Sequence, residues 1–443
     1  MPHPFDREPP MTSMLQSSFM QESTRMAREH GPVFTRRLFN LEFTFVTGAE
    51  LVAELADDNR FEKHVVPALQ VVRPLIGDGL LSAHNHEPNW RTAHELLIPA
   101  FSQAAMRHYH TLMVEVCGRL TESWDRSARD LGRVDVTASM AKVTLEVIGR
   151  AGFGYSFGSF ERDTPHPFVV ALDEVLNHGQ RSVTIPAIAG RFLGKHMAER
   201  NDENVAYLRD VVDEVIARRT RGDHGADLLG LMLDSDVLDP VNIRYQVLTF
   251  LAAGHETTSA AMSFTLYYLA AHPEIAERVR AEADSVLAVG ELEFADIAKL
   301  RYLRRVIDES LRLWPTAPGY SRKAKQDTVL GGRYPMKAGE PVFVLLPALH
   351  REPVWGEDTD AFDPDRFLPE RVRARPPHSF KPFGTGLRAC IGRQFALHQT
   401  ALVIASVLRR YDLALPADYR LEVAEGITFG PVDLTLDLSA RRG

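Results

Sequence analysis

Apolar residues recur at intervals of three or four positions along most of the chain, which is the spacing of an amphipathic helix. Helical patterns of this kind span 51–61, 105–125, 136–153, 204–220, 273–288 and 303–314. Two regions follow another pattern: 34–48 alternates into a run of β-branched and aromatic residues, and 327–349 has Gly-Gly and Ala-Gly turn signals between short apolar runs. The sequence therefore predicts a mainly α protein with a small β portion.

The chain shows no internal repeat, no low-complexity segment and no linker that would divide it into domains. We therefore expect one large domain over 1–443, with a small β region at about 32–48 and a β-rich insert at about 316–348. A basic, glycine-containing stretch at 217–229 is expected to end one helix and lead to the next.

The most apolar stretch, 247–271, is long enough to cross a bilayer. However, His255 and Glu256 interrupt its centre, and a carboxylate beside an imidazole at that depth would be costly in lipid. The stretch is therefore expected to form a buried helix. Residues 1–21 lack an apolar core flanked by basic residues, so we expect neither a signal peptide nor a membrane anchor there.

The amino-acid composition limits which binding partners and which cellular compartment are expected. The chain is 45% hydrophobic and 25% charged, as ordinary globular proteins are. Its formal charge of −8 and the absence of a long basic run argue against nucleic acid as a partner. Two cysteines, Cys117 and Cys390, cannot build a disulfide framework, so a reducing cytoplasm is the expected compartment. Cys117 falls in a helical apolar stripe and is expected in the core.

Cys390 stands in a stretch, 383–392, whose residues together suit a metal-containing cofactor. A thiolate is a strong, soft ligand for iron, and the helix expected to follow offers N–H donors and a favourable dipole. Three glycines, including Gly392, permit tight turns and close approach to a flat cofactor. Phe383 is placed to shield the sulfur, and Arg388 to pair with an anionic group. The alternative, a small buried cysteine before a helix, leaves these neighbours unexplained.

This stretch, Phe-x-x-Gly-x-Arg-x-Cys-x-Gly, resembles the haem-binding signature of cytochrome P450, the family of haem-thiolate monooxygenases. Three other stretches resemble family motifs in the expected order: 253–258, Glu309-x-x-Arg312 and 365–367. The resemblance covers nearly the whole chain. It is strongest towards the haem domain of bacterial self-sufficient fatty-acid hydroxylases, in which that domain is fused to a reductase. It implies a cytochrome P450 fold with haem b bound through Cys390.

The resemblance also implies that Glu309, Arg312 and Arg366 form a buried charged cluster, which would fix the region that carries the cysteine. From the residues alone, Glu309 and Arg312 stand three apart on one helix face. That spacing is equally typical of a weak surface ion pair.

On the long central helix, the resemblance assigns 253–258 to oxygen binding. Ala253 would leave room beside the iron, and Thr257 would offer its hydroxyl to a backbone carbonyl or to oxygen. Glu256 would relay protons from solvent, as cleavage of the O–O bond requires. The alternative is that these polar residues only mark a helix kink.

Haem propionates need hydrogen-bond donors or cations. Trp90 and His94 are candidates because they stand four apart on one helix face, and the resemblance adds Lys63, His86 and Arg388. For each histidine a structural role is an equal alternative. The His-x-His pair that ends at His86 also has a spacing that suits a metal site.

The substrate pocket above the iron is assigned by resemblance to mostly apolar residues: Leu81, Ala253, Thr257, Ala317, Ile427 and Thr428. Leu41 and Phe45 stand where fatty-acid hydroxylases carry an arginine and a tyrosine at the pocket mouth, which should weaken binding of a fatty carboxylate. Leu81 replaces a phenylalanine over the haem and should admit a bulkier group. Residues 181–200 are expected to form a rearranged lid.

We therefore expect a stand-alone monooxygenase that uses haem and O2 to oxidise a C–H or N–H position of a medium-sized, partly apolar substrate. The reaction would be a tailoring step of secondary metabolism, such as hydroxylation, epoxidation or ring formation. The chain ends where the haem domain would end, so electrons from NAD(P)H are expected through a separate ferredoxin or flavodoxin-type protein. The alternatives are a fatty-acid hydroxylase, a haem sensor or carrier, and a serine hydrolase, because Ser156 stands in a Gly-x-Ser-x-Gly pattern.

Overall fold

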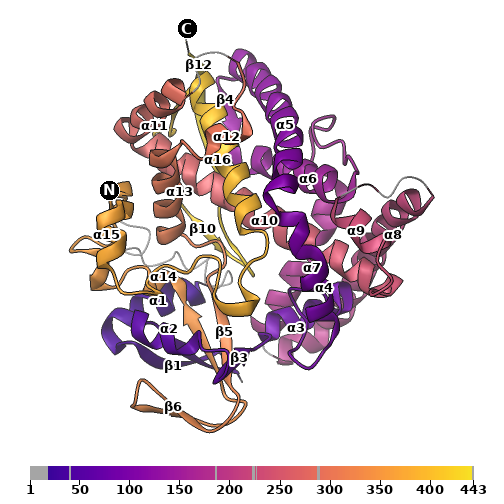
Figure 1. Cartoon of the computed structure of the whole chain (residues 1–443), viewed down its shortest axis with the longest axis vertical. Coiled ribbons are helices and arrows are strands. Elements are labelled where there is room, and N and C mark those ends of the chain that lie inside the picture. The colour runs from indigo at the N-terminus through magenta and orange to yellow at the C-terminus, as the bar shows by residue number, and fades with distance from the viewer. Residues whose placement is uncertain are drawn as a thin grey trace.

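The computed structural model describes residues 18–38, 41–184, 187–221, 225, 227–286 and 290–441. Its helices are α1 (Phe19–His30), α2 (Ala49–Leu55), α3 (Pro67–Ile76), α4 (Asn89–Leu97), α5 (Gln103–Asp130), α6 (Val136–Phe153), α7 (Pro167–Thr184), α8 (Ala187–Thr220), α9 (Leu228–Leu233), α10 (Pro240–Ala271), α11 (Pro273–Val286), α12 (Phe294–Ile297), α13 (Arg301–Leu313), α14 (Leu346–Leu349), α15 (Pro369–Ala374) and α16 (Arg393–Arg410). Its strands are β1 (Val33–Leu38), β2 (Leu41–Val46), β3 (Phe61–Lys63), β4 (Arg133–Asp135), β5 (Gly319–Ala324), β6 (Thr328–Leu330), β7 (Tyr334–Met336), β8 (Pro341–Leu345), β9 (Tyr411–Ala414), β10 (Val423–Glu425), β11 (Phe429–Pro431) and β12 (Thr435–Ala440). The predicted mainly α fold with a small β portion is confirmed (Figure 1).

Most of the first eight strands gather at one end of the molecule in a five-stranded sheet of order β1-β2-β8-β5-β3 (Figure 1). β1 and β2 form an antiparallel hairpin in which Val33 pairs with Val46, as the alternating pattern of this region predicts. β8 joins β2 in parallel and β5 in antiparallel orientation. β5 and β8 of the expected β-rich insert therefore share one sheet with the β1–β2 hairpin, whereas β6 and β7 form a separate two-stranded sheet.

Helix α10 runs through the middle of the molecule beside α16 (Figure 1). Asp239 caps its N-terminus by accepting hydrogen bonds from the N–H groups of Val241 and Asn242 at 2.8 and 2.9 Å, and Pro240 occupies the first turn. The helix is apolar on all sides and packs against α6, α13 and α16, so it is the buried helix that the sequence predicts. Within the described ranges, no helix combines the length and the apolar character needed to span a membrane.

Two apolar clusters meet along α10. One joins it to α5, α13 and α16, and includes the rings of Phe264 and Trp314, which stack with their centres 5.7 Å apart. The other joins it to α3, α6, α7 and α9. Cys117 belongs to the first cluster, which confirms its predicted place in the core.

The segment 181–200, expected to form a lid between two helices, is largely part of those helices, and its role as a lid stays a prediction. α7 continues to Thr184 and α8 already begins at Ala187, so most of the segment is helical, and residues 185–186 lie outside the described residues. The other end of α8 agrees with the sequence, because this helix ends at Thr220 and α9 begins at Leu228.

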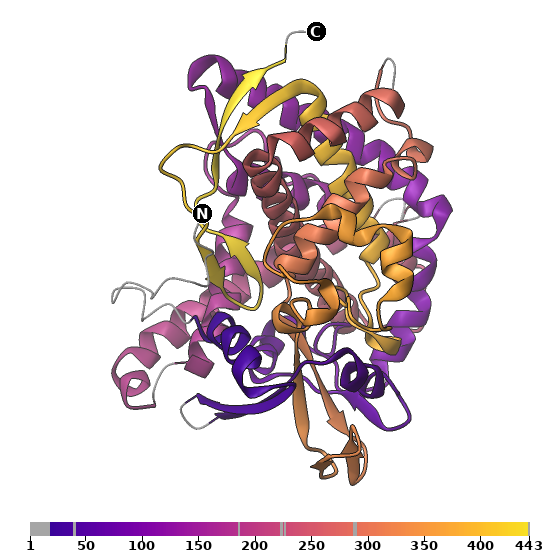
Figure 2. The same cartoon turned by 90° about the vertical axis from the view of Figure 1, so that its left-hand side faces the viewer.

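The helix α1 docks against the small hairpin of β10 and β11 from the far end of the chain (Figure 2). The carboxylate of Glu425 accepts hydrogen bonds from the N–H groups of Met20 and Gln21 at 2.9 and 2.8 Å. It therefore caps the N-terminus of α1, where a negative charge is favoured. The hairpin turn that follows, 426–428, reaches the interior cavity described next.

Candidate active site

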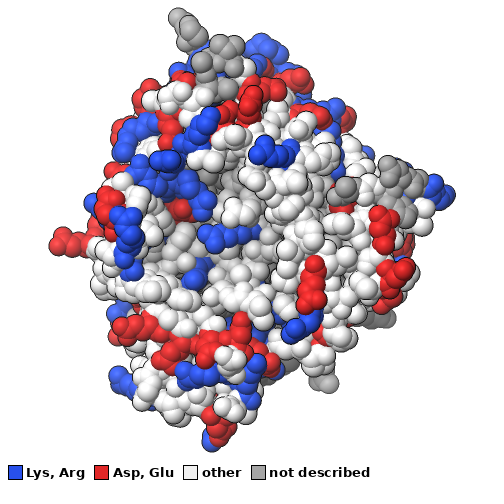
Figure 3. Space-filling view, viewed as in Figure 1, with Lys and Arg blue, Asp and Glu red and all other residues white. Residues whose placement is uncertain are grey.

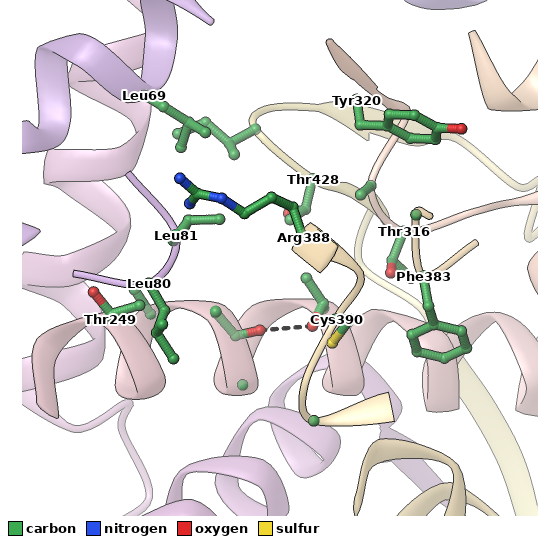
Figure 4. A pocket seen from close by; sticks show the side chains of 18 of the residues that line it. Leu69, Leu80, Leu81, Thr249, Thr316, Tyr320, Phe383, Arg388, Cys390 and Thr428 are labelled. Atoms are coloured by element: carbon green, nitrogen blue, oxygen red, sulfur yellow. Dashed lines mark hydrogen bonds between the residues drawn. The ribbon is translucent and has the colours of Figure 1, made fainter. Parts of the chain in front are cut away.

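A cavity of about 470 Å³ lies between α10, the cysteine loop at 383–392 and the start of β5. Its walls also include residues of α1, α3, β2 and the turn between β10 and β11. Figure 4 shows Phe383, Arg388 and Cys390 approaching α10 from the cysteine loop. The predicted site residues that line the cavity are Lys63, Leu81, Trp90, His94, Ala253, Glu256, Thr257, Ala317, Phe383, Arg388, Cys390, Gly392, Ile427 and Thr428.

The cysteine loop reverses the chain within a few residues. The N–H of Cys390 donates a hydrogen bond to the carbonyl of Phe383 at 2.9 Å, which closes the loop. Gly384 and Gly386 have φ angles of +72° and +67°, a left-handed conformation that other residues rarely adopt. α16 begins directly after its N-cap residue Gly392, so the thiol lies just before a helix N-terminus, as predicted.

The thiol of Cys390 faces the cavity. Its exposed surface is cavity wall, and protein surrounds its other sides. Burial raises its pKa, while the N–H of Gly392 and the charge of Arg393 lower it. A metal cation in front of the sulfur would favour the thiolate strongly. The site therefore suits a sulfur–metal bond better than a free thiolate.

Asp58, from the loop after α2, ties the cysteine loop to the sheet. One carboxylate oxygen accepts a hydrogen bond from the N–H of Leu387 at 3.2 Å, and the other accepts one from Arg322 on β5 at 2.7 Å. A Cβ atom on Gly386 would lie 2.8 Å from this carboxylate, so the close approach requires glycine. Sequence reasoning missed Asp58, because it lies 329 positions from Leu387 and no spacing rule links them.

Glu309 and Arg312 on α13 form an ion pair with no solvent exposure. The guanidinium donates to both carboxylate oxygens at 2.6 and 2.7 Å, and to three backbone carbonyls at 2.7 to 3.0 Å. Arg366 Nε lies 3.5 Å from Glu309 Oε1, so the three predicted members come together. The pair is therefore buried rather than on the surface, and it is costly to break because each partner would be left as an uncompensated charge.

His350 connects this cluster to the cysteine loop. Its carbonyl accepts a hydrogen bond from Arg312 at 2.9 Å, and its ring Nε2 accepts one from the N–H of Lys381 at 3.0 Å, two residues before Phe383. Burial and the nearby arginines lower the pKa of His350 to about 3, so the ring stays neutral and Nε2 remains an acceptor. No pattern in the sequence marked this residue.

Thr257 and Glu256 bring polar groups of α10 to the cavity. The hydroxyl of Thr257 donates to the carbonyl of Ala253, one turn earlier, at 2.7 Å. Burial raises the pKa of Glu256, and a hydrogen bond from Thr428 opposes this only in part, so the carboxyl keeps a proton more readily than a free one. The ring of His255 bonds to a hydroxyl of α6 at 3.0 Å, and burial lowers its pKa to about 4.

Lys63 and Arg388 face each other at one wall of the cavity. The ammonium of Lys63 donates to the carbonyl of Leu81, and burial together with the charge of Arg388 lowers its pKa to about 7. The guanidinium of Arg388 lies 4.0 Å from the centre of the Trp90 ring, and its Nη1 is buried without a hydrogen-bond partner among the described residues. Two crowded cations, one with an unsatisfied donor, fit a ligand that carries anionic groups, such as the propionates of a haem.

The histidines proposed for the propionates differ in placement. His94 lines the cavity and stacks on Trp90 with ring centres 4.9 Å apart. His86 is exposed, stacks on His84 at 5.6 Å and does not line the cavity. Across the described part of the chain, no group of three or more His, Cys, Asp or Glu side chains is arranged to hold a metal ion, so the paired histidines form no such site.

The end of the cavity near α1 and β2 is lined by Phe19, Met20 and Phe43. Leu41 and Phe45 share the strand face of Phe43 but do not line the cavity. Phe45 is fully buried, with the ring of Phe19 5.9 Å away. The resemblance thus identified the strand, and the structure shows which position borders the cavity.

Ser156 lies in the loop after α6, and its hydroxyl donates to the buried carboxylate of Glu146. The Gly-x-Ser-x-Gly pattern therefore follows a helix, whereas a hydrolase elbow follows a strand and opens a helix. This geometry argues against the serine hydrolase alternative.

Comparisons with known proteins agree with this geometry. The family model for cytochrome P450 matches residues 2–431. The chain is 41% identical over 435 residues to a bifunctional cytochrome P450/NADPH–P450 reductase of Bacillus subtilis, with 95% of this chain and 40% of the relative covered. It is 36% identical over 436 residues to a self-sufficient cytochrome P450 monooxygenase of Penicillium camemberti, with 96% and 41% covered. The chain thus spans about two fifths of the length of these relatives.

A solved structure of a cytochrome P450 agrees in fold as well as in sequence. Its crystal structure matches with a TM-score of 0.91 and 39% identity, covering 96% of this chain and 98% of the other. The match of the family model, the identity to the relatives and the shared fold lead to one conclusion. The chain belongs to the cytochrome P450 family.

Proposed function

We propose that this chain is a haem-thiolate monooxygenase that transfers an oxygen atom of O2 to a neutral, partly apolar organic molecule. The observation that carries the proposal is the thiol of Cys390, which faces the cavity just before a helix N-terminus. Thr257 and Glu256 line the same cavity and supply the groups that can move protons.

Haem b fits the residues of this cavity. Cys390 would ligate the iron, and Phe383 would shield the sulfur from water. Lys63, whose pKa is lowered by burial and by the charge of Arg388, would hold the propionates together with Arg388 and the stacked pair that contains Trp90. When bound, the haem supplies the redox-active iron at which O2 is activated.

Glu256 and Thr257 would bring protons to the cavity. Because burial raises the pKa of Glu256, this carboxyl keeps a proton more readily than a free one and can release it towards the cavity. The hydroxyl of Thr257 donates its own proton to the carbonyl of Ala253, and its oxygen can accept a hydrogen bond. To pass a proton on, it would accept one from Glu256 and release its own, which breaks its bond to Ala253. The small side chain of Ala253 leaves space for a reactant beside it.

The proposed substrate is neutral and of medium size. Phe19, Met20 and Phe43 make the end of the cavity near α1 apolar. Of the described cations that line the cavity, Arg322 is engaged by Asp58 and by backbone carbonyls, and the other two crowd together near the cysteine loop. Among the described side chains that line the cavity, a carboxylate would therefore find no available cation near α1 and β2. We propose a natural-product tailoring step, either hydroxylation, epoxidation or oxidative ring formation.

Fatty-acid hydroxylation is the second candidate. The 41% identity to a bifunctional cytochrome P450/reductase favours it, as does an apolar end of the cavity that an alkyl chain would fill. A fatty acid needs a cation or a hydrogen-bond donor in the cavity for its carboxylate, whereas a neutral substrate does not.

Electrons from NAD(P)H would arrive through a separate ferredoxin or flavodoxin-type protein. Figure 3 shows Lys and Arg side chains gathered on the face that carries α16, around α13 and α15 and near its centre. Exposed arginines on elements of this face include Arg91 on α4, Arg107 on α5 and Arg393 at the start of α16. An acidic partner would be attracted to this basic face, which includes α16, the helix that follows the cysteine loop.

A spectral-shift screen of the ferric holoprotein tests the substrate class. A fatty acid, its methyl ester and the matching alcohol form a set that differs only in the head group, to be compared with indolic, peptide-like and polyketide compounds. We expect neutral compounds to bind about tenfold or more tightly than the carboxylate, because the charge lacks a partner. Tightest binding and hydroxylation of the fatty acid would instead select the second candidate. If no compound is oxidised with NAD(P)H and a redox partner, the monooxygenase proposal fails.

A further inference from the structure

The segment 77–83 follows α3, lies beside α10 and brings Leu80 and Leu81 to the wall of the cavity (Figure 4). It approaches α10 very closely. A Cβ atom on Gly79 would lie 2.2 Å from Oγ1 of Thr249 on α10, so a larger residue would push the segment away. The position of the segment on α10 therefore decides how far the two leucines reach into the cavity.

A chain of buried amides joins this segment to α10. The N–H of Leu80 donates a hydrogen bond to Oε1 of Gln246 at 3.1 Å. Nε2 of Gln246 donates to Oδ1 of Asn242 at 3.0 Å, and Nδ2 of Asn242 donates to Oδ1 of Asp78 at 2.8 Å. Gln246 and Asn242 are 0% and 2% exposed, so a broken bond in this chain would leave a buried polar group without a partner.

The carboxylate of Asp78 sets the direction of the chain. Because a carboxylate only accepts hydrogen bonds, Asn242 and Asn89 both turn their NH2 groups towards it, at 2.8 and 2.7 Å. The amide oxygen of Asn242 is then left to accept the NH2 group of Gln246. The amide oxygen of Gln246 in turn faces the segment and accepts the N–H of Leu80. The orientation of each amide thus follows from the one before it.

The other side of the segment meets cations. Three of them donate hydrogen bonds to consecutive carbonyls: Lys63 to that of Leu81, Arg73 to that of Ser82 and Arg388 to that of Ala83. Lys63 and Arg388 are also the proposed partners of the propionates, so an anionic ligand would draw them away from these carbonyls. Gln246 is paired on both sides of its amide and keeps its bond to Leu80.

We propose that Gln246 is a positioning residue that determines the specificity of the reaction. Its bond to Leu80 sets how far Leu80 and Leu81 reach into the cavity. Their reach sets which C–H position of a substrate lies nearest the iron, because small shifts of a bound molecule decide which atom reacts. Gln246 does not line the cavity and acts through Leu80. This inference rests on the proposed monooxygenase function.

Amide hydrogen exchange of the ferric holoprotein tests the contact without turnover. Gln246→Met keeps the length of the side chain but removes both amide groups, so the N–H of Leu80 should exchange about fivefold faster or more. Gln399 on α16 is also buried but does not line the cavity, and Gln399→Met should leave this exchange unchanged. In the wild-type protein, exchange of the Leu80 N–H at the rate of an unprotected amide would overturn the proposal, even where a variant fails to fold.

The reach of the leucines is tested with two azoles that bind ferric haem, imidazole and the bulkier phenylimidazole, through the shift of the haem absorbance. In Gln246→Met the loosened segment can yield, so the ratio of the two dissociation constants should change about fivefold in favour of phenylimidazole. The carboxyl introduced by Gln246→Glu should stay protonated in this buried place, so it offers an acceptor and a donor and should restore the wild-type ratio. An unchanged ratio in Gln246→Met would overturn the proposal.

The effect on specificity is tested with dodecanol, NAD(P)H and a redox partner. Gln246→Met should spread hydroxylation over more carbon positions at an unchanged haem content, whereas Gln399→Met should keep the wild-type distribution. A wild-type distribution in Gln246→Met would overturn the role in specificity. If the wild-type protein oxidises no compound, the proposed function fails, while hydrogen exchange and the azoles still decide whether Gln246 positions the leucines.

Discussion

Thr257 and Thr265 make the same hydrogen bond at two places on α10. Each hydroxyl donates to the carbonyl four residues earlier at 2.7 Å, but Thr257 lines the cavity whereas Thr265 is fully buried in the helix packing. Thr257→Ala removes the hydroxyl next to Glu256, so we expect less efficient proton delivery and more peroxide per NAD(P)H consumed. Thr265→Ala removes an equivalent bond and should keep the wild-type yield. Full coupling in Thr257→Ala would contradict the role of this hydroxyl.

The lowered pKa of Lys63 predicts that the stability of the haem-free protein depends on pH. Its pKa is lowered from 10.5 to about 7 in the folded state by burial and by Arg388, so protonation opposes folding. The free energy of unfolding should therefore be highest above pH 10.5, the ordinary pKa of lysine, and should fall as the pH drops from about 10 to about 7. Lys63→Met should flatten this dependence in thermal melts of the haem-free protein.

The same substitution tests the contact with the propionates. Lys63→Met removes one cation, so haem loss from the holoprotein to an excess of an acceptor protein should be about tenfold or more faster. Lys337 is mostly exposed in its ion pair, and Lys337→Met should leave the rate unchanged. A wild-type rate in Lys63→Met would remove this residue from the haem site.

Helix α13 holds the cysteine loop through buried charge. Glu309→Gln would leave Arg312 and Arg366 buried without their carboxylate, which should cost about 3–5 kcal/mol of unfolding free energy and release haem. The pair of Lys337 and Asp327, at 2.8 Å, has exposed fractions of 82% and 63%, so Lys337→Ala should leave the free energy of unfolding nearly unchanged. Denaturation followed by haem absorbance measures the stability and the haem retention of both variants. If Glu309→Gln and Lys337→Ala lost equal amounts of stability and haem, the cluster would not position the cysteine loop.

The ends of a helix could be predicted where capping residues next to it in the sequence determine them. α6 spans Val136–Phe153 as its pattern predicts, because Asp135 caps its start and Gly154 ends it in a left-handed conformation with φ +59°. α8 begins at Ala187, although a clear apolar period appears only from 204. α8 as a whole packs against α7 and α10, and such tertiary contacts leave no periodic signal in the sequence.

The uneven distribution of charge over the surface predicts how the molecule binds its electron donor. Basic side chains gather on the face of α16, so reduction by an acidic donor should slow as salt is added, because screening weakens long-range attraction. Arg91→Glu should slow the reduction at low salt and reduce its salt dependence. Arg333→Glu, on the distant loop between β6 and β7, should change neither. Stopped-flow reduction at several ionic strengths measures this, and a rate independent of salt would exclude electrostatic docking there.

Across the molecule, the sequence revealed the parts of the site that are contiguous in the chain. The cysteine loop and the stretch around Thr257 each carry several informative residues within ten positions. Asp58, His350 and Phe43 could not be found this way, because each reaches the site from a distant segment that only packing brings near. Their residue types are ordinary, and their role follows from contacts rather than from spacing.

X-ray absorption at the iron edge of the purified holoprotein tests the central claim, that the thiolate of Cys390 binds the haem iron. We predict one sulfur neighbour in the wild-type protein and in Cys117→Ala, whose cysteine is buried in the core. The sulfur should be absent from Cys390→Ala. A first shell made only of nitrogen and oxygen in the wild-type protein, or a sulfur that persists in Cys390→Ala, would contradict the account.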